Sequence, residues 1–355
     1  MLSKYKQHAN NIREGLIAHV NFMSLILVTL VFLLAFGCSS EKKRLQKAQE
    51  NYTKGRQAYI LFTPKGLEEA IGEYEEAIDL NKNYAPAYAG LGEAYSFWGL
   101  WNEQNGNKKD KTLYDKSLEY SQKAVELAPD LGDSHRALAS SYRALGRFKD
   151  AKKEAEKAIK LNPSDSEAYY ILWTVTGADT DSRYIIRALE LNPNLSVAHN
   201  DLGYIYYTKG RYEEATEHLR RAIEISPDLV QAHTNLGLTL AAQKKFDEAQ
   251  EEYRKAIEIT PNYLLAHYNL GVVLGSQGKF DEAISEFEKS IEINPDFPEA
   301  YLSLALAYES KGETKEALEE YQRFVDLASA NKSRYENIVA EAKNRIKKLQ
   351  ESGAQ

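Results

Sequence analysis

Four histidines recur at a regular spacing, and they are the residues that first suggest chemistry. His199, His233 and His267 are 34 residues apart, and His135 lies 64 residues before His199. Histidine is a common zinc ligand, but zinc needs its ligand nitrogens at about 2.0–2.1 Å from one point. If each histidine belongs to a separate helix, neighbouring helix axes lie about 8–10 Å apart, and inward-packed rings cannot converge. We therefore interpret the four rings as core residues and expect no metal site.

Other constellations that could support catalysis are missing from the sequence. It contains no glycine-rich phosphate loop, no His-Glu-x-x-His motif and no Gly-x-Ser-x-Gly motif. The single cysteine, Cys38, excludes an internal disulfide. The many carboxylates fall on helix faces that we expect to be exposed to solvent. We expect a protein that is not an enzyme, needs no cofactor and has no small-molecule substrate.

A 34-residue repeat positions the histidines, and it is clearest in residues 196–297. Each unit holds two amphipathic runs with apolar residues at helical spacing, separated by a polar turn such as residues 209–211. Glycine and alanine leave room where two helices cross, and proline lacks the amide that would continue a helix. One unit cannot bury its apolar face alone, so the units must stack. The recurring residues are Leu202, Gly203, Tyr206, Ala215, Ala222 and Pro227, then Leu236, Gly237, Leu240, Ala249, Ala256 and Pro261, then Leu270, Gly271, Leu274, Ala283, Ser290 and Pro295.

This pattern resembles the tetratricopeptide repeat (TPR). The resemblance implies an all-α fold, a right-handed α–α superhelix of about eight helix-turn-helix repeats over residues 51–331, closed by a capping helix and tail over residues 332–355. It also implies that the first helix of each repeat lines a concave groove. The repeats that we delimit are 51–84, 85–131, 132–165, 166–195, 196–229, 230–263, 264–297 and 298–331.

Two repeats depart from the pattern. Repeat two carries an insertion with Trp98 and Trp101, whose rings either seal the insertion against a neighbouring repeat or form an exposed interaction patch. Repeat four is four residues short and has Trp173 where glycine or alanine belongs. We expect the Trp173 ring to fill the space that the shortened second helix leaves.

The groove of repeats five to eight is the candidate binding site. Asn235 and Asn269 directly precede a Leu-Gly pair, and similar repeats use asparagine there to hydrogen-bond an extended peptide backbone. Asparagine offers both a donor and an acceptor, which matches a peptide group. Asp201 and Ser303 stand at the equivalent positions. We expect side-chain selectivity from three apolar residues beside them, Leu238, Val272 and Leu306.

The N-terminal residues indicate a membrane anchor. Lys4, Lys6 and Arg13 precede the apolar run of residues 24–36, and residues 37–38 are Gly-Cys. The end of this run resembles the bacterial lipobox, which implies cleavage after residue 37, lipidation of Cys38, and a tether over residues 38–50. The alternative is an uncleaved anchor helix. Either arrangement puts the repeats outside the cytoplasm, facing the periplasm, and Ser39 and Ser40 resemble the sorting residues of outer-membrane lipoproteins.

The charge balance narrows the class of partner. The first 37 residues carry a net charge of +2, which leaves −9 on the remainder of a chain whose total is −7. An acidic repeat array disfavours nucleic acid, since phosphate binding needs concentrated lysine and arginine. We therefore expect a scaffold of the bacterial envelope that binds peptide segments of other proteins. The alternatives are a self-assembling structural scaffold and an accessory subunit of a secretion, pilus or outer-membrane assembly system.

Overall fold

A computed structural model describes residues 40–104, 109–179, 182–329 and 332–353, and every regular element in these ranges is a helix. The first helix covers residues 40–59. The helices that follow are α2 (Pro64–Leu80), α3 (Ala85–Gln104), α4 (Lys111–Leu127), α5 (Gly132–Ala144), α6 (Phe148–Leu161), α7 (Ser166–Thr176), α8 (Arg183–Leu191), α9 (Ser196–Thr208), α10 (Tyr212–Ile225), α11 (Val230–Ala242), α12 (Phe246–Ile259), α13 (Leu264–Ser276), α14 (Phe280–Ile293), α15 (Pro298–Lys311), α16 (Thr314–Ala328) and α17 (Lys332–Gly353).

A short polar corner ends each second helix and starts the next repeat. The residue after the last helical turn donates its backbone N–H to the carbonyl four residues earlier, as Ser226 does to Ala222 at 2.9 Å. A proline follows it at the ends of α4, α6, α8, α10, α12 and α14, and because proline has no amide hydrogen the helical ladder cannot continue there, whereas Lys82 takes this place after α2. The chain therefore turns back within four residues, and α11 starts at Val230.

Glycine allows the two helices of a repeat to pack closely. A Cβ built on Gly237 of α11 would lie 2.5 Å from the Tyr253 ring of α12, and one on Gly271 of α13 would lie 2.7 Å from the Phe287 ring of α14. Both rings are buried. The expectation that these glycines mark close helix crossings is confirmed, and the contacting group is a large side chain from the second helix.

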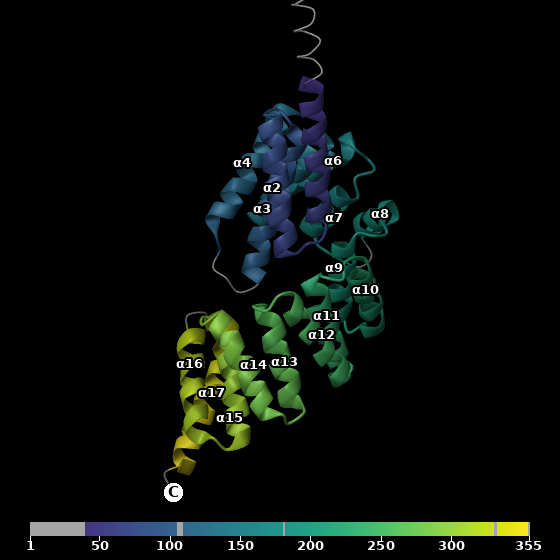
Figure 1. Ribbon diagram of the computed structural model, residues 1–355. Coiled ribbons are helices and arrows are strands. Elements are labelled where there is room, and N and C mark those ends of the chain that lie inside the picture. The colour runs from purple at the N-terminus through teal and green to yellow at the C-terminus, as the bar shows by residue number, and fades with distance from the viewer. Residues whose placement is uncertain (1–39, 105–108, 180–181, 330–331, 354–355) are drawn as a thin grey trace, which may run out of the picture.

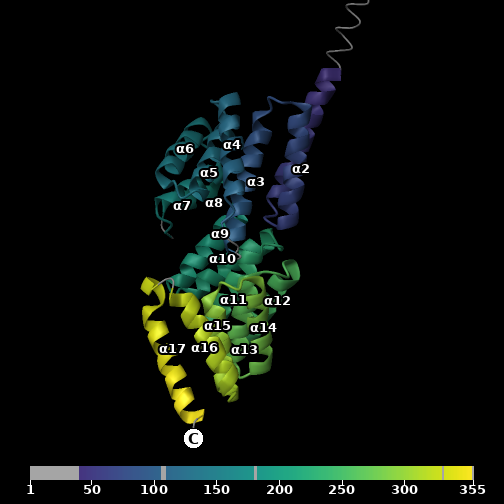
Figure 2. The same cartoon turned by 90° about the vertical axis from the view of Figure 1, so that its left-hand side faces the viewer.

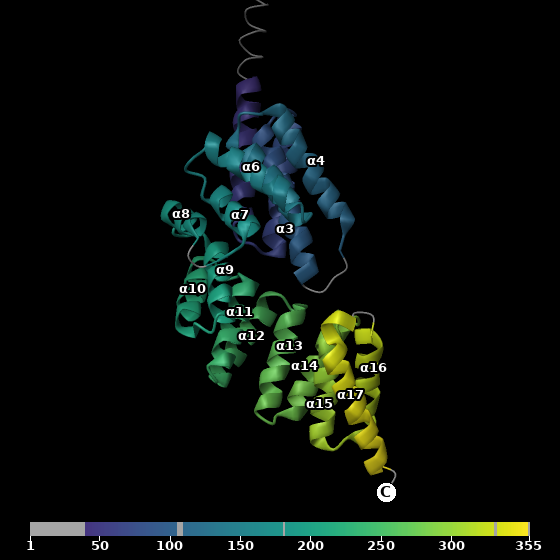
Figure 3. The same cartoon turned by 180° about the vertical axis from the view of Figure 1, so that it is seen from behind.

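The helix pairs stack in chain order into a superhelix. Helices α2 to α8 form one part of it, and α9 to α17 continue from there to the C-terminal end (Figure 1). A view from the side shows α16 and α17 running next to each other at that end (Figure 2). Seen from behind, α6, α7 and α8 follow one another down the first part and lead into α9 (Figure 3). The all-α superhelix predicted from the repeat is confirmed.

Three irregular segments can be compared with what the sequence predicted for them. Residues 40–50 were expected to be a tether, but they are the start of a helix that runs to residue 59, because Ala48 packs fully buried in the N-terminal core. Trp98 and Trp101 are half-buried, and Trp98 packs against the same core. Trp173 does fill the space beside the shortened helix α8, where it is 1% exposed and lies against Ile185. Cys38 and the apolar run before it lie outside the described residues.

The close packing at Gly237 predicts opposite effects for two alanine substitutions. Gly237→Ala forces its methyl group against the Tyr253 ring, and we expect it to destabilise the protein by about 1–3 kcal/mol. Gly275→Ala is the control, because its Cβ would meet only Ala283 at 3.8 Å, and a helical glycine replaced by alanine gains about 0.5–1 kcal/mol. Urea denaturation followed by circular dichroism measures both. Equal stabilities for the two variants would contradict the packing account.

Candidate functional site

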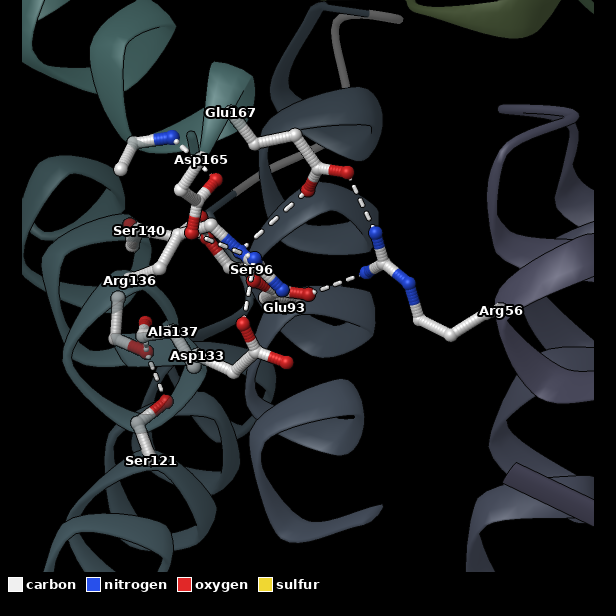
Figure 4. Close-up of polar contacts among 12 residues, drawn as sticks. Arg56, Glu93, Ser96, Ser121, Asp133, Arg136, Ala137, Ser140, Asp165 and Glu167 are labelled. Carbon is white, nitrogen blue, oxygen red and sulfur yellow. Dashed lines mark hydrogen bonds and ion pairs between the residues drawn. The ribbon is translucent and has the colours of Figure 1, made fainter. Parts of the chain in front are cut away.

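The inner face of the first four repeats is closed by a buried network of charged side chains (Figure 4). Arg136 of α5 is its centre. Its Nε donates to Glu93 Oε1 of α3 at 2.6 Å, and its Nη1 donates to Asp165 Oδ2 at 2.8 Å. These three side chains are between 3% and 8% exposed, so the charges are largely removed from water.

A second arginine ties the first helix into the same network. Arg56 donates to Glu93 Oε2 at 2.7 Å and to Glu167 Oε1 of α7 at 2.5 Å. This contact joins residues 111 positions apart and crosses the inside of the superhelix (Figure 4). Burial acts to raise the pKa of Glu167, but Arg56 and Arg136 outweigh it and lower that pKa, so the carboxylate is ionised at neutral pH. The inner face of the N-terminal repeats is therefore occupied by the protein's own side chains.

The inner face of the following repeats is open. A cavity of about 560 Å³ lies against α7, α9, α11 and α13, all of which are first helices of their repeats. Aromatic and aliphatic side chains alternate in its wall with neutral hydrogen-bonding groups, and Asp201 is its one charged lining residue. The lining residues are Trp173, Thr174, Ala178, Asn200, Asp201, Tyr204, Ile205, Gln231, Thr234, Asn235, Leu238, Tyr263, Leu265, Tyr268 and Asn269.

Four of the predicted groove residues meet in this cavity: Asp201, Asn235, Leu238 and Asn269. The remaining three do not line it. Ser303 lies farther along on α15, where its hydroxyl is 3.4 Å from the Tyr268 hydroxyl. Val272 and Leu306 are 39% and 37% exposed. They continue a row with Tyr204 and Leu238, in which one residue per repeat stands at a 34-residue interval. The groove therefore has a deep part at repeats four to seven and a shallow apolar extension.

A chain of internal hydrogen bonds already engages two of the predicted residues. Tyr170 donates to Asp201 Oδ2 at 2.6 Å, and Asn200 Nδ2 donates to Asp201 Oδ1 at 3.0 Å. Asn235 Nδ2 donates in turn to Asn200 Oδ1 at 3.0 Å. Burial raises the pKa of Asp201, which the Tyr170 hydroxyl partly offsets. Asp201 thus positions its neighbours, and the exposed hydrogen-bonding capacity of the site rests on the amides.

Gln231 supplies an acceptor that sequence reasoning missed. Its Oε1 is buried in the cavity wall and has no hydrogen-bond donor among the described residues. A buried acceptor left unpaired costs about 1–3 kcal/mol, so a ligand N–H that reaches it gains correspondingly. Gln231 occupies the repeat position of Asp133, 98 residues before it, if the four missing residues of repeat four are counted. Comparison of equivalent positions along the chain would have found it.

Three of the four histidines are packed in the core as predicted, whereas His199 is half-buried, and each of the four also makes a polar pair. His135, His233 and His267 are 2–7% exposed. In each ring Nε2 faces the carbonyl of a proline six residues earlier at 2.8–2.9 Å, and Nδ1 faces a glutamate of the second helix at 2.6–2.7 Å. His199 follows the same plan, except that Nδ1 faces His218 Nδ1 at 2.9 Å. The Nδ1 contacts join the two helices of one repeat, and the Nε2 contacts reach the proline at the end of the preceding repeat.

Comparisons with known proteins point to one family. Models of the tetratricopeptide repeat match residues 132–175, 184–217, 228–296 and 268–332, and a model described as TPR repeat matches residues 203–244. Serine/threonine-protein phosphatase 5 of Rattus norvegicus and of Homo sapiens is 32% identical over 124 residues, which is 35% of this chain. The matched part spans only 22% of the length of those relatives.

Similarity among solved structures concerns the fold alone. The structure titled as the APC/C hetero-tetramer Cut9-Hcn1 superposes with a TM-score of 0.65 at 13% identity. The superposition covers 83% of this chain and 54% of that one. At this identity it indicates the same helical superhelix and nothing about ligands.

The charged network predicts a large cost for removing its central cation. Arg136→Met leaves Asp165 buried without its counter-charge and leaves Glu93 with one arginine, Arg56, in place of two, and we expect the free energy of unfolding to fall by about 3–5 kcal/mol. Urea unfolding followed by tryptophan fluorescence measures it, because Trp98, Trp101 and Trp173 all lie in the first four repeats.

The matched control for this substitution is Arg187→Met. Arg187 pairs with Glu190 on the surface, with the two side chains 48% and 58% exposed. Such pairs contribute about 0–1 kcal/mol. If Arg136→Met were as stable as Arg187→Met, the network would not be what closes the inner face.

Proposed function

The chain belongs to the tetratricopeptide-repeat family over residues 132–175 and 184–332, and from that premise we propose that it is a binding scaffold that holds an extended peptide segment of a partner protein in its C-terminal groove. The observation that carries the proposal is the change in the inner face along the superhelix. Charged side chains fill it in the first repeats, whereas a cavity of about 560 Å³ remains in the later ones.

Peptide is the ligand class that fits the chemistry of this cavity. Asn235, Asn269 and Gln231 present amide groups, which can pair with both the N–H and the C=O of a backbone. Successive first helices are about 8–10 Å apart, and an extended chain advances about 3.3 Å per residue. One contact from the groove therefore falls at about every third residue of the peptide.

The lining also defines which peptide side chains are favoured. Asp201 is already bonded to Tyr170 and Asn200, so the cavity offers no free charge to pair with an ionic side chain. Burying an unpaired charge is costly. Tyr204, Leu238 and Leu265 offer apolar contact instead. The groove accordingly selects neutral segments with aliphatic or aromatic side chains.

The scaffold acts in the bacterial envelope within this proposal. Acyl chains on Cys38 hold it on a membrane with the repeats facing the periplasm, and the outer membrane is the favoured site. The support comes from the basic, apolar and Gly-Cys segments in residues 1–38. Among the described helices, none is both long and apolar enough to cross a membrane.

Removing the two asparagine amides should weaken peptide binding. We expect Asn235→Ala combined with Asn269→Ala to reduce affinity about ten- to a hundredfold, since each hydrogen bond contributes about 0.5–1.5 kcal/mol. The probe is a peptide selected from a random displayed library against the purified protein, titrated by calorimetry. Asn262→Ala, an exposed asparagine in the turn before α13, is the control and should bind like the wild type. Unchanged affinity in a folded double variant would place binding elsewhere.

Lipid anchoring has its own test. Mass spectrometry of protein extracted from membranes should find an N-terminus at Cys38 that carries acyl chains. Cys38→Ala should leave a longer, unprocessed form, because the modified sulfur is missing. Mature protein that retains Met1 or Met23 would refute lipidation and favour the uncleaved anchor helix.

A further inference from the structure

Repeat five differs from its neighbours at one polar pair between its two helices. In repeats three, six and seven a histidine of the first helix meets a glutamate 19 residues later. In repeat five the residue 19 positions after His199 is His218, and the two Nδ1 atoms are 2.9 Å apart. The same position in the fold therefore joins two bases in place of a base and an acid.

The histidine–glutamate pairs remain bonded when the ring is protonated. Both ring nitrogens of His233 face oxygen acceptors, Pro227 O at 2.8 Å and Glu252 Oε2 at 2.6 Å. An imidazolium donates to both acceptors, and the carboxylate balances its charge. Acidification toward pH 5 therefore leaves the contact between the two helices of this repeat intact.

The His199–His218 pair differs in which ring nitrogens carry a hydrogen. His199 Nε2 faces the Pro193 carbonyl at 3.2 Å, so that nitrogen carries a hydrogen. The neutral ring then accepts at Nδ1 from His218 Nδ1–H. One added proton can enter at His218 Nε2 without disturbing this bond. A second must go to His199 Nδ1, which sets two N–H donors and two positive charges against each other.

Glu217 of α10 favours protonation of both rings, but burial outweighs it, so the surrounding groups compensate that charge only in part. Glu217 and Arg221 of α10 carry opposite charges near the pair, and Arg221 is already paired with Glu224 at 3.0 Å. From α9, the Tyr206 ring stacks on His218 with centroids 5.4 Å apart, and the Arg211 guanidinium lies over that ring at 4.5 Å. Arg211 is itself paired with Glu214 at 2.6 Å. The other contact is the Pro193 carbonyl from the α8–α9 connection.

We propose that the α9–α10 pair is an acid-sensitive joint in the wall of the groove, which opens when His199 and His218 are both protonated. Helix α9 carries the cavity residues Asn200, Asp201 and Tyr204, so opening this joint distorts the site. The effect on ligand affinity rests on the proposed peptide function, whereas the opening itself does not. Acidification then releases a peptide that is held at neutral pH.

The pKa values of the two histidines in the folded protein determine how the stability of the joint changes with pH. Burial lowers the pKa of both His199 and His218 below the ordinary 6.5. The folded joint thus resists protonation, and its stability is complete above about pH 6.5 and is lost as the pH falls below that value. His267 has the opposite sign: burial acts to lower its pKa, but Glu286 and the Pro261 carbonyl raise it overall. Its repeat is therefore stabilised in acid.

Amide hydrogen exchange without any peptide tests the joint directly. After correction for intrinsic exchange rates, protection in α9–α10 should fall about tenfold or more between pH 7.5 and pH 5.0. Protection in α11–α12, with its His233–Glu252 pair, is the internal control and should not fall. Equal behaviour of the two helix pairs would overturn the proposal.

Two variants distinguish opening of the α9–α10 joint from a general response of the protein to acid. His218→Glu rebuilds the pair seen in the neighbouring repeats, and His199→Tyr copies Tyr301, whose hydroxyl donates to the Pro295 carbonyl at 3.1 Å in repeat eight. Both should abolish the acid-induced loss of protection. Persistence of that loss in both variants would overturn the proposal.

Binding measurements then address the link to the groove. The library-selected peptide is titrated at pH 7.5 and pH 5.0, and the wild type should lose affinity about tenfold more than His218→Glu does. Equal losses of affinity in the wild type and in His218→Glu would show that the joint does not regulate peptide binding. If no peptide binds at pH 7.5, the proposed function fails, and the exchange experiment still decides whether the joint exists.

Discussion

Buried charge on the inside of the superhelix is the constraint that separates the closed first repeats from the open later repeats. Glu93, Asp165 and Glu167 project inward from successive repeats, and a carboxylate removed from water is tolerated only when it is paired. Arg136 and Arg56 provide that pairing, and Arg56 reaches across the inside to do so. The first repeats are thereby fastened to one another, and their own side chains occupy the inner face that a cavity leaves open in the later repeats.

The later repeats keep the same backbone but have neutral side chains on the inner face. The position of Arg136 is occupied by Asn200 in repeat five and by Thr234 in repeat six. Without long charged side chains to cross the inside, a cavity remains between the first helices. One superhelix thus contains a closed part and an open part, the open part being the proposed binding site, and the difference arises from a few positions per repeat.

Repeat four lies where these two parts meet. Its second helix, α8, has nine residues where α10 has fourteen, and the Trp173 ring takes up the missing volume. The indole Nε1 donates to the Asp179 carbonyl at 2.8 Å, which holds the ring in place. Trp173 also lines the open cavity, so the residue that repairs the short repeat also forms the first wall of the groove.

The sequence by itself determined the repeat and most of its local structure. Residues such as Gly237, Ala249 and Pro261 act through short-range sterics and helix termination, which depend on spacing alone. The resemblance to the tetratricopeptide repeat implied that first helices line the groove, and Asp201, Asn235 and Asn269 do meet at one cavity. The irregular N-terminal segment was less well predicted, because whether residues 40–50 pack as a helix depends on the core that receives Ala48.

Only the tertiary structure decided which polar groups are satisfied. Asp201 was grouped with Asn235 by position, yet Tyr170, 31 residues earlier, and Asn200 already engage its carboxylate. The partners of Arg136 and of the histidines likewise come from other helices. Hydrogen bonds and ion pairs between helices depend on side-chain directions at distances of about 3 Å, which a 34-residue period does not specify. Where the superhelix is closed and where it is open is therefore a property of the folded chain.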